Sequence, residues 1–166
     1  MSNTPAAARR QIRLGFAAFL AAAVPLQGAP AAEVSAVQTL AGSWGGSGRI
    51  YYTDGSSESI RCTAYYTGGS GALKMAIQCK SERNSIHVRS QLRISGSRAS
   101  GEWEERTFNV SGSASGQVGG SSMSLNLGGG GFSGTMSVSF GSQAHTVTIT
   151  TQGIAMNRAT MSFNRR

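Results

Sequence analysis

Residues 60–79, IRCTAYYTGGSGALKMAIQC, hold two segments in which apolar and polar residues alternate, separated by a glycine-rich turn. Alternation with a period of two is typical of a β-strand that buries one face. If the two cysteines oppose each other in an antiparallel hairpin, every opposed pair on their face is apolar. These pairs are Cys62 with Cys79, Ala64 with Ile77, and Tyr66 with Met75. Turn, pattern and register therefore agree on a β-hairpin.

The same alternation continues along the rest of the chain, in short segments divided by glycine- and serine-rich turns. No helix-length pattern intervenes, so consecutive strands are expected to connect as hairpins. The pattern predicts an all-β fold, an antiparallel meander of about eight to ten strands, closed as an up-and-down barrel because closure removes exposed sheet edges. A β-sandwich is the alternative. Two further expected pairs are Leu92 with Trp103 and Phe140 with His145.

The start of the chain has the anatomy of a bacterial-type signal peptide. Three arginines within residues 9–13 precede an apolar run over residues 14–26, and Ala-Pro-Ala at residues 29–31 has the form of a cleavage site. The run is shorter than a membrane span, and no later segment resembles one. We predict export by the general route, cleavage near Ala31 and a periplasmic or secreted mature protein. The expected organisation is a signal peptide over 1–31, a short N-terminal tail over 32–41 and one barrel domain over 42–166.

Export also determines the state of the cysteines. Cys62 and Cys79 are the two cysteines of the 166-residue chain, and an oxidising compartment favours a disulfide between them. In the chain-entropy model, closing a loop of this length stabilises the fold by on the order of 3 kcal/mol.

The inward positions of the predicted strands are rich in aromatic residues and methionine. Methionine side chains adapt to ligands of irregular shape, which indicates an exported, non-catalytic barrel that binds a small apolar or amphipathic molecule. The expected ligand-lining residues are Trp44, Tyr66, Met75, Trp103, Met123, Met136, Phe140, His145 and Met161. The same side chains could instead fill a solid core, as in other small barrels. Interior volume distinguishes the two interpretations.

The solid-core alternative is a structural or interaction module. The chain carries 15 Lys and Arg against seven Asp and Glu, and three of the arginines lie in the leader, so the mature domain is mildly basic. Such a domain would bind an anionic surface, a glycan or a protein through its basic outer wall. The expected wall residues are Arg49, Arg61, Arg89 and Arg93.

Gly42-Ser43-Trp44 opens the first predicted strand. This G-x-W resembles the start of lipocalins and avidin-like barrels, and residues 42–48 (GSWGGSG) resemble the glycine-rich opening of nitrobindin-type barrels, all of them calycin-type small β-barrels. The resemblance implies that Trp44 plugs one end of the barrel and that the interior holds a small apolar ligand. In lipocalins a later arginine packs on this tryptophan, and Arg158 is the positional candidate.

Residues suited to catalysis or metal binding are few. Asp54 is the only aspartate and lies in a predicted turn, so a Ser-His-Asp triad is not expected. Two histidines and two oxidised cysteines do not supply a clustered metal-ligand set, and no glycine-rich stretch stands between a strand and a helix, as a phosphate loop requires. We predict no enzymatic activity, no metal and no cofactor. Export disfavours nucleic acid, and the expected partners are a small apolar ligand or an anionic envelope component.

The two histidines and Glu105 are the titratable side chains whose surroundings the strand pattern predicts. His87 should point outward into solvent. The pairing of Phe140 with His145 places an imidazole on the apolar face near a strand end, where water or backbone would satisfy its nitrogens; contact with haem or another ligand is the alternative. Glu105 points inward if Trp103 does, and burial would then raise its pKa unless it were paired. A bulge that turns Glu105 outward is the favoured interpretation.

The mature protein is expected to begin close to residue 32 and to contain one disulfide. Removal of the leader and oxidation of two thiols both change the mass of the chain. The intact mass of the exported protein under denaturing conditions, with and without reductant, measures both. A mass that retains the leader, or that does not rise on reduction, would contradict the prediction.

Overall fold

The computed structural model describes residues 31–69 and 71–166. The predicted signal peptide therefore lies outside the described residues except for its last position. The described part forms one helix followed by ten strands. These are α1 (Ala31–Leu40), β1 (Gly42–Tyr52), β2 (Ser57–Gly69), β3 (Ala72–Lys80), β4 (Ser85–Ser95), β5 (Arg98–Glu105), β6 (Val110–Val118), β7 (Ser122–Gly129), β8 (Phe132–Phe140), β9 (Ala144–Gln152) and β10 (Met156–Arg165).

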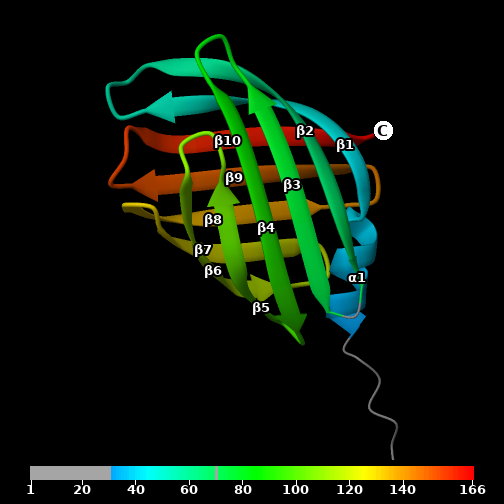
Figure 1. Ribbon diagram of the computed structural model, residues 1–166. Helices are drawn as coiled ribbons and strands as arrows, with labels where there is room; N and C mark the ends of the chain where they lie inside the picture. The colour runs from blue at the N-terminus through cyan, green and yellow to red at the C-terminus, as the bar shows by residue number, and fades with distance from the viewer. Residues whose placement is uncertain (1–30, 70) are drawn as a thin grey trace, which may run out of the picture.

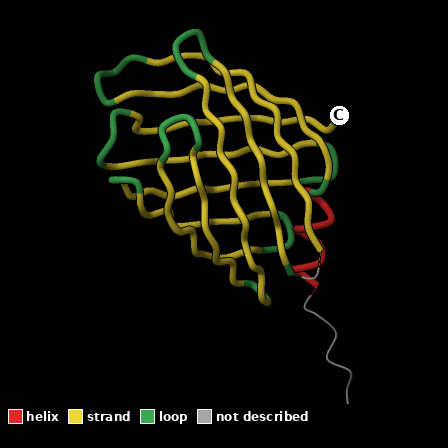
Figure 2. The backbone as a smooth tube through the Cα atoms, viewed as in Figure 1, coloured by secondary structure: helices red, strands yellow, loops and turns green. Residues whose placement is uncertain are grey.

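Each strand pairs with the next in antiparallel fashion, and β10 pairs with β1, so the sheet closes into a barrel (Figure 1). Figure 2 shows strands surrounding the interior, with the helix confined to one end. The prediction of an all-β meander closed into an up-and-down barrel is confirmed, and the sandwich alternative is wrong.

The register of the β2–β3 hairpin is the one expected from the sequence. Cys62 opposes Cys79 and the two form a disulfide. The other two expected pairs, Ala64 with Ile77 and Tyr66 with Met75, are also present. The cysteine pair, the turn and the apolar pattern together therefore predicted this hairpin correctly.

The expected register of the β4–β5 hairpin is wrong by two residues. Trp103 opposes Ser90, and Leu92 opposes Gly101. The hairpin has a tight turn at residues 96–97, where Gly96 adopts a φ of 63°, a left-handed conformation that glycine accepts without strain. A shift of two residues keeps each side chain on its own face, so Trp103 still points inward.

Glycines in β1 make room for large side chains on β10. Trp44 and Ile50 of β1 are buried in the core, and Gly46 and Gly48 occupy positions of the same parity between them. A Cβ atom on Gly46 would lie 2.6 Å from the ring of Phe163 on β10. A larger residue at position 46 would therefore displace that ring from the core.

The segment expected to be a short N-terminal tail forms α1, at one end of the barrel (Figure 1). Val37 and Leu40 of this helix are buried, and the helix packs against β2 and β6. Because Gly68 of β2 has no side chain, Val37 can approach it closely; a Cβ atom there would lie 2.9 Å from a Val37 methyl group. Within the described part of the chain, no helix is long and apolar enough to cross a membrane.

Replacing both Cys62 and Cys79 by alanine should lower the free energy of unfolding by about 3 kcal/mol. The bond joins residues separated by 17 positions, and its loss returns conformational freedom to the unfolded chain. Urea unfolding measures the change. As a control, reductant should weaken the wild type and leave the double variant unaffected. Equal stability of the variant and the oxidised wild type would contradict the prediction.

Candidate ligand-binding cavity

One end of the barrel is closed around Trp44, which is fully buried. The indole Nε1–H donates a hydrogen bond to the Leu40 carbonyl oxygen at 2.8 Å. The guanidinium carbon of Arg165 lies 4.3 Å from the centre of the indole ring, a cation–π contact. Arg165 also donates to the carbonyl oxygens of Thr39 at 2.7 Å and Ala41 at 2.9 Å. Trp44 and Arg165 thus join α1, β1 and β10 at this end.

The arginine that packs on the tryptophan is not the expected one. Arg158 lies over the ring of Tyr51, 4.4 Å from its centre, and the β1–β10 register places these two residues opposite each other. The same register places Arg165 opposite Trp44. The arginine that packs on Trp44 is therefore Arg165 and not Arg158. The pairing of the first strand with the last, which closes the barrel, is the feature that identifies it.

His145 belongs to the closed end. It opposes Phe140, as expected, and is only 2% exposed. Its ring stacks on Phe163 with centroids 4.6 Å apart, and it meets Trp44 edge-on at 4.6 Å. Nε2 lies 3.0 Å from the Tyr66 hydroxyl, whereas Nδ1 has no hydrogen-bond partner among the described residues. Among the described residues, the partner of Nε2 is a side chain and not the expected backbone, and satisfaction of Nδ1 by water stays a prediction.

Electrostatics keep this cluster neutral. Burial, with a smaller contribution from the Arg165 charge, lowers the pKa of His145 to about 4. Burial also raises the pKa of Tyr66 above its ordinary value. At neutral pH the imidazole and the phenol are both uncharged, which suits a filled, aromatic closed end.

A cavity of about 510 Å³ occupies the interior beyond the closed end. Its wall is almost entirely apolar. Of the expected lining residues, four are in this wall: Met75, Trp103, Met136 and Met161. Much of the aliphatic wall was not among the expected lining residues, including Ile50, Ile60, Ile77, Leu125, Val147 and Ile149. Each of these six residues occupies an inward position in the alternating pattern of its strand, and this position could have identified it.

The other expected lining residues are buried but lie outside the cavity wall. They are Trp44, Tyr66, Met123, Phe140 and His145. Alternation assigns a side chain to the inner or outer face of a strand. It does not give the depth of that side chain along the barrel axis, so residues of the closed end and of the cavity wall look alike in the sequence.

Tyr52 and Asn84 line the cavity, and both bind Glu58, which is not part of the cavity wall. The Tyr52 hydroxyl donates a hydrogen bond to the Glu58 carboxylate, and the Asn84 side-chain amide donates to the same carboxylate at 3.1 Å. The bond from Tyr52 outweighs burial and helps to hold the pKa of Glu58 below its ordinary value. Phe108, which is 61% exposed, and Ile154 also line the cavity. These exposed apolar side chains mark the opening to solvent.

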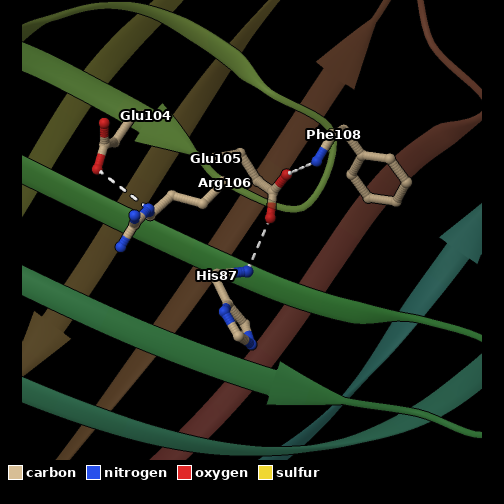
Figure 3. Close-up of polar contacts among 5 residues, drawn as sticks. All are labelled: His87, Glu104, Glu105, Arg106 and Phe108. Atoms are coloured by element: carbon tan, nitrogen blue, oxygen red, sulfur yellow. Dashed lines mark hydrogen bonds and ion pairs between the residues drawn. The ribbon is translucent and has the colours of Figure 1, made fainter.

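Glu105 points inward and is 7% exposed, so the favoured interpretation of an outward bulge is wrong. Its carboxylate accepts the backbone N–H of His87 at 2.7 Å and that of Phe108 at 2.6 Å (Figure 3). Burial alone would raise the pKa of Glu105, but these N–H donors overcome it and the pKa is lowered. Figure 3 also shows that Glu104 and Arg106 form a separate exposed ion pair.

The two remaining polar groups of interest lie on β4. The His87 ring, expected in solvent, is half-buried, and its Nε2 lies 3.2 Å from the Ser85 hydroxyl. Ser90 lines the cavity opposite Trp103 and is 9% exposed. Its hydroxyl has no hydrogen-bond partner within residues 31–69 and 71–166. Ser90 therefore presents an unpaired polar group to an apolar chamber.

The arginines of the expected basic wall are exposed. Arg49 and Arg61 lie on β1 and β2, and Arg89 and Arg93 lie on β4. The strand between the two pairs, β3, carries the exposed Lys74 and Lys80, and Lys80 opposes Arg61. Glu104 of β5 opposes Arg89 and adds a negative charge beside the wall. A role for this basic wall stays a prediction.

No protein-family model matches the sequence, and no curated protein matches it. The structure is similar to that of Rv2717c from M. tuberculosis, with a TM-score of 0.64 and 13% identity over 82% of this chain and 99% of that chain. It is also similar to the S-type phycobiliprotein lyase CPES from Guillardia theta, with a TM-score of 0.60 and 10% identity over 80% of this chain and 92% of that one. Both are small antiparallel barrels, consistent with a calycin-like fold.

The prediction that the chain is not an enzyme is corrected by this comparison. A similar barrel is a lyase, so the architecture is one on which catalysis occurs. The prediction rested on the scarcity of familiar catalytic side chains, and that scarcity is not sufficient to exclude a reaction. At 10% identity the likeness concerns the fold alone.

The stability of the barrel should fall as the pH drops from 6.5 towards 4. The pKa of His145 is lowered from 6.5 to about 4 in the folded protein, so the unfolded chain binds more protons across that interval. The loss should reach on the order of 3 kcal/mol, measured by urea unfolding at a series of pH values.

The variant His145→Phe should abolish this dependence of stability on pH between pH 6.5 and about 5, and the matched control His87→Phe should retain it. Carboxyl groups with lowered pKa, such as Glu58 and Glu105, act at lower pH because their stabilisation is lost only as pH falls below about 4.5. If the free energy of unfolding of His145→Phe still falls with pH in this interval, a group other than His145 causes the pH dependence.

Proposed function

We propose that this barrel binds a small apolar or amphipathic molecule in its interior cavity. The observation that carries the proposal is the cavity of about 510 Å³, because a solid core would leave no such volume. Ligand sites for small molecules span roughly 300 to 1,000 Å³ and are mostly apolar. The likeness to a barrel that is a phycobiliprotein lyase gives further support for a ligand in the interior.

The lining supplies the driving force for binding. Aliphatic side chains and methionines form most of the wall, and transfer of a ligand from water to such a wall contributes about 25 cal/mol for each Å² of apolar surface removed from water. Met75, Met136 and Met161 have flexible thioether side chains. They allow the wall to adjust to a ligand of irregular outline.

The opening favours entry from one side. Trp44 and its partners fill the opposite end, whereas Phe108 and Ile154 are exposed where they line the cavity. A ligand would pass these two apolar side chains before reaching the interior. We further propose that binding takes place outside the cytoplasm after cleavage near Ala31; the disulfide supports this, because such bonds persist in oxidising compartments.

The test is a titration with N-phenyl-1-naphthylamine, a neutral apolar dye that fluoresces when it leaves water. The wild type should bind it, and displacement by other apolar molecules should be competitive. Ala114 lies in the cavity wall on β6, so Ala114→Phe fills part of the chamber and should weaken dye binding at least about tenfold.

Ala144 is exposed on β9 and does not line the cavity, and Ala144→Phe is the matched control that should leave binding unchanged. Circular dichroism checks the fold of both variants. If Ala114→Phe does not fold, Met136→Trp tests the same wall from β8. Dye binding by the wild type that none of the folded wall variants reduces would contradict a site in the cavity, and no binding at all would contradict the proposed function.

A further inference from the structure

Of the buried side-chain nitrogen and oxygen atoms that line the cavity, all but one have a hydrogen-bond partner among the described residues. The indole Nε1–H of Trp103 donates to the Ser113 carbonyl oxygen at 3.1 Å, and the Thr151 hydroxyl donates to the Met156 carbonyl oxygen. Both carboxylate oxygens of Glu105 accept backbone N–H groups. These groups have little capacity left to recognise a ligand.

Ser90 is the exception. Its side chain is 9% exposed, lines the cavity, and has no hydrogen-bond partner in the described part of the chain. A buried hydroxyl without a partner destabilises a fold, because it has lost its hydrogen bonds to water. A ligand that supplies a hydrogen bond at this point recovers that loss. Ser90 is therefore placed to recognise one polar group inside an apolar chamber.

The charge of the wall restricts what that polar group can be. Glu105 is the one acidic residue that lines the cavity, and no Lys, Arg or His of the described ranges lines it. Glu105 opposes Val88 and Trp103 opposes Ser90, so Glu105 is a diagonal neighbour of Ser90 on the same inner face, at about 7 to 8 Å between backbones. A carboxylate or phosphate bound to Ser90 inside the cavity would be repelled by Glu105 and would meet no cationic side chain of the described residues in the cavity wall.

We propose that the cavity selects a neutral amphipathic ligand with one hydroxyl or carbonyl group, which hydrogen-bonds to the Ser90 hydroxyl beside Trp103. The apolar remainder of the ligand occupies the aliphatic and methionine-rich wall. Anionic amphiphiles of the same length, such as fatty acids, are rejected. This inference rests on the proposed function and adds the chemical class of the ligand.

The experiment compares three probes with the same carbon chain: decan-1-ol, decanoate and 1-chlorodecane. Binding is measured by displacement of N-phenyl-1-naphthylamine at pH 8, where decanoate is ionised. The wild type should bind decan-1-ol at least about tenfold more tightly than decanoate, because the alcohol pairs with Ser90 and carries no charge. Glu105→Gln should narrow that difference by strengthening decanoate binding.

The variant Ser90→Ala distinguishes the contribution of the Ser90 hydrogen bond to ligand affinity from the contribution of apolar packing. It should weaken decan-1-ol binding about five- to tenfold and leave 1-chlorodecane, which lacks a strong hydrogen-bonding group, unchanged. It should also raise the thermal midpoint of the protein without ligand, because an unpaired buried hydroxyl is removed. Ser137→Ala, at an exposed position on β8, is the control and should alter neither affinity.

The outcomes distinguish the two proposals. If decanoate binds the wild type as tightly as decan-1-ol, or if Ser90→Ala weakens the alcohol and the chloroalkane equally, the inference on ligand class is overturned while the cavity remains a binding site. If the dye binds but none of the three probes displaces it, the inference on ligand class is likewise overturned. If the dye itself does not bind, the proposed function fails as well.

Discussion

The contact between Trp44 and Arg165 closes one end of the barrel and so determines where in the interior a cavity can lie. It joins the first strand to the last at the position where the sheet closes, and the hydrogen bonds of both side chains fix α1 across the same end. Phe163 and His145 then stack behind the indole ring. Because large aromatic groups fill this end, the cavity lies in the rest of the interior, where its wall is apolar and Phe108 and Ile154 are exposed.

The apolar wall of the cavity includes two buried polar side chains, Glu105 and Ser90, of which the first has hydrogen-bond partners in the protein and the second has none among the described residues. Glu105 is stabilised as an anion by the N–H groups that it accepts, so its charge is a fixed property of the wall. Ser90 has no such compensation. Binding sites commonly retain groups that reduce stability because a ligand completes them. On this account, the serine provides attraction for one polar group, and the carboxylate provides repulsion against anions.

Much of the fold could be predicted from local pattern, and much of the site could not. The Cys62–Cys79 pairing was expected because an oxidising compartment favours a disulfide, and the alternation and the turn agreed with that register. The predicted β4–β5 register was wrong because the turn at Gly96 is tight. A longer turn shifts the register by two residues, but both turns leave each side chain on the same face of its strand, so the alternating pattern does not distinguish them. Met123 and Met136 are both inward, yet only Met136 lines the cavity. Depth along the axis depends on the stagger of the closed sheet, which no single hairpin reveals.

The most direct test of the account is methyl NMR of methionine during titration with decan-1-ol. Met75, Met136, Met156 and Met161 line the cavity, whereas Met123 is buried outside its wall. The four cavity methyl signals should shift together and saturate at the same ligand concentration, and the Met123 signal should stay in place. Shifts of Met123 equal to those of the other four, or no saturable shift in any of them, would contradict a barrel that is filled at one end and binds its ligand at the other.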